Sequence, residues 1–214
     1  MLPGRRNGSR SWSTLVAVRL HALATSFLFL ACALVACGAG APPVIRDEIA
    51  RAPQGMVTVV FFTDFQCPFC RRTHAALARV MADHPGRVHV VVRHVPLRMH
   101  PDARTAARAA VCGEALGARE DLIDALYKAP DLGEQAVEQL VLERGVDRHE
   151  YVACLADPAT DARIDKDTAM LDALGGDGVP LLYVGRVRLD GSQTRRSLDL
   201  AIDDAAREIQ ASHR

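Results

Sequence analysis

Short runs of apolar and β-branched residues mark four candidate strands. The run MVTVVFF, Met56 to Phe62, predicts a strand buried on both faces of a sheet. Alternating valines between Arg87 and Val95 predict a second strand, and PLLYV, Pro180 to Val184, predicts a third. The segment from Arg186 to Leu189 follows a glycine and is expected to pair with the third strand as a hairpin.

Apolar residues at helical spacing fill most of the remaining chain. Pro68 suits the first turn of a helix that continues to His84, because a missing N–H costs nothing there. In residues 101–175 the apolar positions recur with the periodicity of an α-helix, so this region is expected to be helical. A last amphipathic helix is expected from Thr194 to Ser212. Strand, helix, strand, helical insertion, hairpin and closing helix describe an α/β fold with helices packed on a sheet.

Three aspartates in the helical region are candidate helix N-caps. Asp131 and Asp147 each precede a glutamate by three residues, which is the spacing of a capping box. Asp157 precedes Pro158, and proline suits the first helical position. We therefore expect a helix to begin after each of these aspartates.

The first 36 residues have the pattern of an export signal. Four arginines and no acidic residue accompany an apolar stretch, Ala22 to Ala36, that is too short for a comfortable transmembrane helix. The sequence LVACG, Leu34 to Gly38, resembles a bacterial lipobox, in which cleavage leaves Cys37 to be lipidated. In the alternative interpretation, Cys37 is an ordinary small residue at a signal-cleavage site. We expect residues 37–55 to be a lipid-anchored tether and residues 56–214 to be the folded domain.

The charge of the exported chain gives no indication of nucleic-acid binding. The sequence has 214 residues, with 26 basic and 26 acidic side chains. Residues 1–36 contain four of the basic residues and none of the acidic ones, so their removal leaves a net charge of about −4. A mildly acidic domain of this length is large enough for one good core, and it lacks the basic face that nucleic acid requires.

Four cysteines remain after export and lipidation, an even number that is typical of an oxidising compartment. Cys67 and Cys70 lie at the start of the helix that follows the first strand. Unsatisfied N–H groups and the helix dipole stabilise the thiolate form of Cys67 there, and Cys70 lies one turn further on, within reach of a disulfide. The pair is expected to exchange two electrons through a mixed disulfide, with no other cofactor.

Two other interpretations of Cys67 and Cys70 compete with the redox pair. A metal site would need further ligands, and His74, one turn after Cys70, is the candidate within reach. We expect no metal, because a single Cys-x-x-Cys with no second pair is a weak metal signal. A purely structural disulfide across two residues would constrain the unfolded chain very little.

The sequences VVFFTDFQCPFC and GVPLLYVG, and the order of elements, resemble the DsbA-like branch of the thioredoxin superfamily. The resemblance implies a thioredoxin-like fold with a helical insertion at about 101–175. It implies that Pro180 is cis, and that Val179 pairs with the substrate main chain. Pro68 and Phe69, within the motif, are expected to contact substrate as well.

The resemblance also bears on Cys112 and Cys154, and the sequence departs from the family pattern at two positions, Phe61 and Phe69. Many DsbA-like proteins bridge cysteines at similar places, so a structural disulfide between Cys112 and Cys154 is expected. Two unpaired thiols or a second redox pair are the alternatives. Phe61 stands where relatives often carry a buried acid, and Phe69 stands where strong oxidases have histidine, which leaves the direction of electron flow open. Asp64 is expected to be a cap or solvated.

Three of the eight histidines lie on the helix or loops near the predicted site. His74, His94 and His100 are interpreted as surface or capping residues. His94 and His100 flank the loop after the second strand, from which they could approach the cleft.

The sequence thus predicts an extracytoplasmic, lipid-anchored thiol:disulfide oxidoreductase. Its expected direction is oxidation of exported protein thiols, with a DsbB-like membrane partner that reoxidises it. A reductase or isomerase supplied by a membrane electron donor is the alternative within the class. A metal-binding protein that uses Cys67, Cys70 and His74 is the alternative outside it. The expected location is the periplasmic side of a bacterial membrane.

Overall fold

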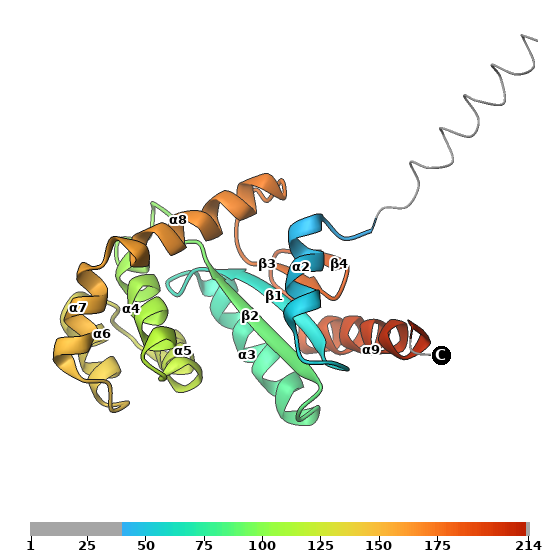
Figure 1. The fold of residues 1–214 in the computed structure, drawn as a ribbon, viewed down its shortest axis with the longest axis horizontal. Helices are drawn as coiled ribbons and strands as arrows, with labels where there is room; N and C mark the ends of the chain where they lie inside the picture. Colours follow the sequence, from blue (N-terminus) through green and yellow to red (C-terminus); the bar gives the residue numbers. More distant parts are fainter. Residues whose placement is uncertain (1–39, 213–214) are drawn as a thin grey trace, which may run out of the picture. The chain divides into compact units, whose positions relative to one another are not determined.

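The computed structural model describes residues 40–212, apart from the side chains of Glu120 and Ser212. The elements along this range (Figure 1) are α2 (Pro43–Arg51), β1 (Val57–Thr63), α3 (Pro68–Asp83), β2 (Val88–His94), α4 (Ala103–Ala115), α5 (Arg119–Lys128), α6 (Glu134–Leu142), α7 (Arg148–Ala156), α8 (Pro158–Ala173), β3 (Leu181–Val184), β4 (Val187–Asp190) and α9 (Arg195–Ser212). The α/β prediction is confirmed, and the predicted strands agree closely with the observed ones.

Four strands form one sheet in the order β2-β1-β3-β4. β1 is parallel to β2 and antiparallel to β3, and β3 and β4 form the expected hairpin. Phe62 of β1 pairs with Leu181 of β3, which brings the start of β3 beside the end of β1. The loops that carry Cys67 and Pro180 are therefore neighbours, although they are far apart in sequence.

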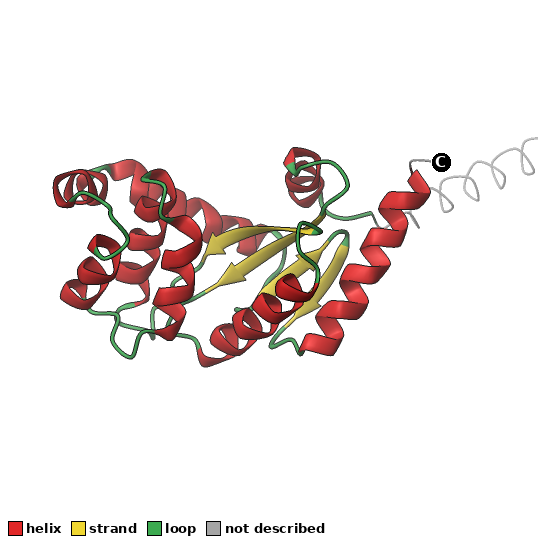
Figure 2. Cartoon of the chain, turned by 90° about the horizontal axis from the view of Figure 1, so that it is seen from below, coloured by secondary structure: helices red, strands yellow, loops and turns green. Residues whose placement is uncertain are grey.

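Helices cover both faces of this sheet. On one face, Val59 and Phe61 of β1 pack with Leu77 of α3 and with Leu198 and Ile202 of α9 in one buried cluster. Figure 2 shows α3 and α9 lying side by side against the strands. On the other face, residues of β1 and β3 pack with α2 and with the end of α8 in a second cluster, which includes Val60, Phe62, Tyr183, Ile45 and Leu171.

The helical insertion comprises α4 to α8, with α4 to α7 gathered beside the sheet (Figure 1). Within it, a disulfide joins Cys112 of α4 to Cys154 of α7, with 5.9 Å between the two Cα atoms. The alternative of two unpaired thiols is therefore wrong for these cysteines.

The segment predicted as a tether over residues 37–55 contains helix α2. Pro43 occupies the first turn of α2, so the prolines that suggested a tether instead begin a helix. Ile45 is fully buried, and the carboxylate of Glu48 forms a buried ion pair with the guanidinium of Arg93 in β2. The tether prediction is wrong for this part of the segment, because the apolar and acidic side chains of α2 have partners on the sheet.

Two of the three predicted N-caps are confirmed. Asp147 accepts a hydrogen bond from the N–H of Glu150 at 3.0 Å, and Asp157 accepts one from the N–H of Ala159 at 2.8 Å. Asp131 is not the N-cap, because Gly133, two residues later, occupies that position and α6 begins at Glu134. The Asp131 carboxylate instead accepts from the Gly133 N–H at 2.8 Å, so it orders the turn before the helix.

The predicted signal peptide and the lipidation site Cys37 lie outside the described residues. In the range 40–212, none of the helices combines the length and the hydrophobicity that a membrane crossing would need.

Candidate active site

Cys67 and Cys70 occupy the first turn of α3. Cys67 is the N-cap residue and Pro68 is the first helical residue, while Cys70 lies one turn further in. Both thiols are free; the exposed fraction is 4% for Cys67 and 0% for Cys70. The two cysteines thus differ in depth, and Cys67 is the one nearer to solvent.

The peptide bond between Val179 and Pro180 is cis and faces Cys67. The Sγ atom of Cys67 lies 3.9 Å from the carbonyl oxygen of Val179. Val179 is half-buried and Pro180 is buried at the start of β3. A thiol, a helix N-terminus and the backbone before a cis-proline therefore meet at one edge of the sheet.

Asp64 is buried beneath the loop that precedes Cys67, so of the two expectations, a cap or a solvated carboxylate, the solvated one is wrong. Its Oδ1 atom accepts from the N–H of Gln66 at 2.7 Å and from the N–H of Cys67 at 3.2 Å. The carboxylate thereby satisfies backbone donors just before the helix begins and fixes the position of Cys67.

The same carboxylate joins this loop to the loop after β2. Its Oδ2 atom accepts from the N–H of Leu97 and from Nδ1 of His100, both at 2.8 Å. Gln66 and Asp102 add two reciprocal hydrogen bonds, of 3.0 and 2.7 Å, between these loops. His100 therefore reaches the site through Asp64, a role that the sequence prediction did not assign.

The sulfur of Cys70 lies in a buried environment with two hydrogen-bonding neighbours. Burial raises the pKa of the Cys70 thiol well above its ordinary value, and hydrogen bonds from the Thr63 hydroxyl and the Asp64 backbone oppose that increase. The Thr63 hydroxyl is also hydrogen-bonded to the Tyr127 hydroxyl of α5. Cys70 is consequently held as a thiol when it is not reacting.

Comparisons with known proteins assign the family. A family model described as thioredoxin matches residues 51–204, which include both cysteines and the cis-proline. The chain belongs to the thioredoxin family.

Solved structures similar to this thioredoxin-family protein agree with that assignment. A thioredoxin-like oxidoreductase from Silicibacter pomeroyi is 30% identical, with a TM-score of 0.66 over 72% of this chain and 89% of that chain. DsbA2 from Pseudomonas aeruginosa is 27% identical, with a TM-score of 0.58 over 71% of this chain and 90% of that chain. The predicted DsbA-like resemblance and thioredoxin-like fold are confirmed.

Curated relatives of this thioredoxin-family protein are much longer proteins. The Na⁺/H⁺ antiporter NhaA 3 of Salinispora tropica is 31% identical over 162 residues, which are 75% of this chain and 25% of the antiporter. The antiporter NhaA of Herminiimonas arsenicoxydans is 28% identical over 171 residues. The chain thus spans about a quarter of the length of these relatives.

Pro68 and Phe69 form the exposed side of the thioredoxin-family motif. The side chain of Phe69 is 52% exposed. The guanidinium of Arg72 lies over its ring, with 4.6 Å between Cζ and the ring centroid. Such a contact holds the Arg72 cation beside the exposed side of the motif.

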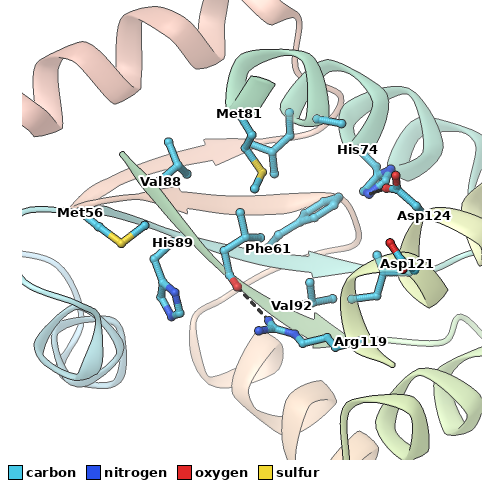
Figure 3. A pocket seen from close by; sticks show the side chains of 14 residues that line it. Met56, Phe61, His74, Met81, Val88, His89, Val92, Arg119, Asp121 and Asp124 are labelled. Carbon is cyan, nitrogen blue, oxygen red and sulfur yellow. Dashed lines mark hydrogen bonds and ion pairs between the residues drawn. The ribbon is translucent and has the colours of Figure 1, made fainter. Parts of the chain in front are cut away.

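His74 is engaged at a pocket on the α3 side of β2 rather than with the cysteines. Its Nε2 atom lies 3.1 Å from Oδ1 of Asp124, and its ring stacks on Tyr127 with 4.1 Å between centroids. Figure 3 shows His74 and Asp124 side by side at one end of this pocket, whose volume is about 430 Å³. Among residues 40–212, no three His, Cys, Asp or Glu side chains are grouped so that they could hold a metal ion.

His94 is buried in this thioredoxin-family fold, so its interpretation as a surface or capping residue is wrong. Its ring stacks on Phe65, with 5.6 Å between centroids, and the residue is 2% exposed. Burial, reinforced by the nearby positive charges of Arg163, Arg119 and Arg93, lowers the pKa of His94 to about 3.

The lowered pKa of His94 predicts a loss of stability in acid. The unfolded chain takes up this proton near the ordinary histidine pKa of about 6.5, so the stability present above that pH is lost as the pH falls towards 3. We expect His94 to contribute a slope approaching about 1.4 kcal/mol per pH unit below pH 6. Denaturant titrations from pH 6.5 to 4.5 should show a shallower slope for His94→Leu than for the wild type, and equal slopes would contradict this prediction.

Sequence reasoning did not identify Thr63 and Tyr127. Strand alternation along β1 could have placed Thr63 on the same face as Phe61, towards α3. Tyr127 lies 64 residues away from Thr63 on a helix of the insertion, and no local pattern links the two.

Proposed function

We propose that this chain, a thiol–disulfide oxidoreductase with a DsbA-like fold, is a dithiol oxidase for exported proteins and uses Cys67 and Cys70. The observation that carries the proposal is the meeting of Cys67 Sγ with the Val179 carbonyl at 3.9 Å, at the N-terminus of α3 and beside a cis-proline. A thiolate is stabilised at a helix N-terminus, and an extended client can pair with the backbone of Val179. The exposed residues Pro68 and Phe69 extend the client-binding surface.

The proposed reaction balances two electrons between protein and client. A client thiolate attacks Cys67 Sγ of the oxidised pair, the Cys67–Cys70 bond breaks, and Cys70 leaves as a thiolate that takes a proton. A second client thiolate then attacks the client sulfur of the mixed disulfide and releases Cys67. The client gains a disulfide, and the pair, now reduced, requires a DsbB-like membrane partner to reoxidise it.

The direction of electron flow depends on how strongly the reduced pair is stabilised. Phe69 provides neither a hydrogen bond nor a charge to the Cys67 thiolate, which favours a weaker oxidant. Arg72, stacked on Phe69, supplies a nearby positive charge that stabilises the Cys67 thiolate and therefore favours a stronger oxidant. We therefore propose a moderate oxidant, and we retain a reductase or isomerase as the second candidate.

The proposed location is the periplasmic side of a membrane, with a lipid anchor at Cys37. The support comes from the export pattern of residues 1–36 and from the Cys112–Cys154 disulfide, since structural disulfides persist in oxidising compartments. Fractionation of cells that express the wild type or Cys37→Ala tests the anchor. The variant should move from the membrane to the soluble fraction, and an unchanged distribution would argue against lipidation.

Equilibration of residues 40–214 with glutathione buffers tests the direction of electron flow between this protein and its clients. We expect a reduction potential less negative than about −230 mV, with faster oxidation of a dithiol peptide than reduction of insulin. A potential near about −270 mV, with rapid insulin reduction, would contradict the oxidase and favour the reductase.

A further inference from the structure

Thr63 connects the inner cysteine to the helical insertion. Its hydroxyl is hydrogen-bonded to the hydroxyl of Tyr127 on α5, and it acts on the thiol of Cys70 on α3 as a nearby polar group that lowers the pKa of that thiol. The exposed fractions of Thr63, Cys70 and Tyr127 are 1%, 0% and 2%. A continuous line of polar atoms, excluded from water, therefore runs from the insertion to the sulfur.

The Tyr127 hydroxyl is held in place by two aromatic neighbours. Phe65 lies 4.8 Å and His74 lies 4.1 Å from the Tyr127 ring, measured between centroids. Because the Tyr127 ring packs against both of these rings, its hydroxyl has little freedom to turn towards another hydrogen-bond partner.

The chemistry of the two hydroxyls favours one direction of hydrogen bonding. A buried phenol donates its proton to an available acceptor, and the Thr63 oxygen is the acceptor that this site offers Tyr127. With that lone pair occupied, the Thr63 O–H is free to rotate and donate to the Cys70 sulfur. The backbone N–H of Asp64 is a second donor to the same sulfur.

A donor at this sulfur matters because Cys70 must become charged during turnover. When Cys70 attacks a mixed disulfide on Cys67, a new Cys67–Cys70 bond forms, the bond from Cys67 to the departing thiol breaks, and the Cys70 proton passes to the departing thiolate. In the reverse step Cys70 leaves as a thiolate. In both steps negative charge develops on the buried Cys70 sulfur, and a buried charge that lacks a hydrogen-bond donor is high in free energy.

The neighbouring position on β1 cannot supply this stabilisation. Phe61 and Thr63 lie on the same face of the strand, because side chains alternate along it, and Phe61 is packed in the core with α3 and α9. An apolar ring neither donates a hydrogen bond nor accepts a proton. Thr63 is therefore the side chain at the end of β1 that is equipped to assist Cys70.

We propose that Thr63 is a catalytic residue, whose hydroxyl donates to the Cys70 sulfur as charge develops, and that Tyr127 is a positioning residue that orients this hydroxyl. The inference rests on the proposed function of Cys67 and Cys70 as the redox pair. It assigns a role in the chemistry to the helical insertion, through α5.

The test separates formation of the mixed disulfide from its resolution. Reduced protein is mixed with glutathione disulfide and quenched in acid, and mass spectrometry follows the Cys67–glutathione adduct and the Cys67–Cys70 disulfide. For Thr63→Val, the adduct should form within about twofold of the wild-type rate, since the first step does not use Cys70 as a nucleophile. Resolution should slow about 3- to 10-fold, because one lost hydrogen bond to a charged group is partly offset by the greater nucleophilicity of a more basic thiolate.

Matched variants distinguish chemistry from structure. Thr63→Ser keeps the hydroxyl and should resolve at nearly the wild-type rate, while Tyr127→Phe should slow resolution about two- to threefold. Thr58→Val is the control on the same strand, since it removes a buried hydroxyl that has no hydrogen-bond partner. Tyr151→Phe is the control for a buried tyrosine in α7. Both controls should match the wild type in both steps.

Two results would overturn the role of Thr63. One is wild-type resolution by Thr63→Val, and the other is equal slowing of resolution by Thr63→Val and Thr63→Ser. If the wild type itself forms no adduct at Cys67, the proposed redox pair fails instead, whatever the Thr63 variants do. Thr63→Ser and Tyr127→Phe keep the test decisive if Thr63→Val does not fold.

Discussion

Cys67→Ser and Cys70→Ser will each reduce oxidation of a dithiol peptide to the uncatalysed rate, and only Cys70→Ser will still trap, on Cys67, a client that carries a disulfide. Serine at position 67 removes the sulfur that forms the mixed disulfide with the client, and a hydroxyl cannot replace it. Serine at position 70 prevents formation of the Cys67–Cys70 disulfide that a client thiolate attacks. It also removes the thiol that would release Cys67 after Cys67 has attacked a client disulfide. Peptide oxidation assays measure the turnover, and non-reducing gels with mass spectrometry identify the client trapped on Cys67.

The other cysteine pair provides the control for these variants. The double variant Cys112→Ala and Cys154→Ala lacks two sulfurs that lie in the insertion. Assayed at a temperature at which it is folded, it should retain turnover. Turnover by Cys67→Ser, or absence of a trapped client with Cys70→Ser, would contradict the assignment of the attacking and resolving sulfurs.

Loss of the Cys112–Cys154 disulfide will lower the free energy of unfolding by about 4 kcal/mol. The bridge closes a loop with a sequence separation of 42, and in the chain-entropy model a loop of this length restricts the unfolded state considerably. The cost is large because the bridge ties α4 to α7, two helices of an insertion that has no sheet of its own.

Denaturant unfolding of the double variant and of the wild type, without reductant, measures this loss. Reduction of the wild type under the same conditions should reproduce it, because both treatments remove the same cross-link. A loss below about 1 kcal/mol would contradict the prediction and would indicate that the unfolded insertion is already compact.

The order of the strands and helices from β1 onward could be predicted because these elements carry periodic signals of their own. The apolar run before Cys67 and the alternating valines before His94 are long enough to identify β1 and β2 without tertiary information. Asp147 and Asp157 act as caps through neighbouring backbone groups, so sequence spacing was sufficient to predict them. The same local logic failed for Asp131, because the next residues form a turn before α6 begins.

Helix α2 could not be predicted because its stabilising partners lie elsewhere. Three prolines in residues 42–53 suggested a tether, and a helix of nine residues is marginal on its own. It forms because Ile45 packs against the sheet and Glu48 pairs with Arg93, a residue 45 positions later. Tertiary contacts of this kind leave no local pattern.

The support around the cysteines escaped prediction for the same reason. Asp64 is buried because four donors converge on its carboxylate, and two of them, Leu97 and His100, come from the loop after β2. The contact between Thr63 and Tyr127 joins β1 to α5 of the insertion. A motif identified the reacting atoms, whereas the groups that position them depend on the folded topology.

Competitive alkylation of the reduced wild-type protein at neutral pH tests the central claim most directly. A limiting amount of iodoacetamide is added together with a free cysteine peptide, and mass spectrometry locates the label. Cys67 should react faster than the free peptide, while Cys70 stays unlabelled in its buried environment. Labelling of Cys67 no faster than the peptide, or preferential labelling of Cys70, would show that Cys67 is not the activated nucleophile.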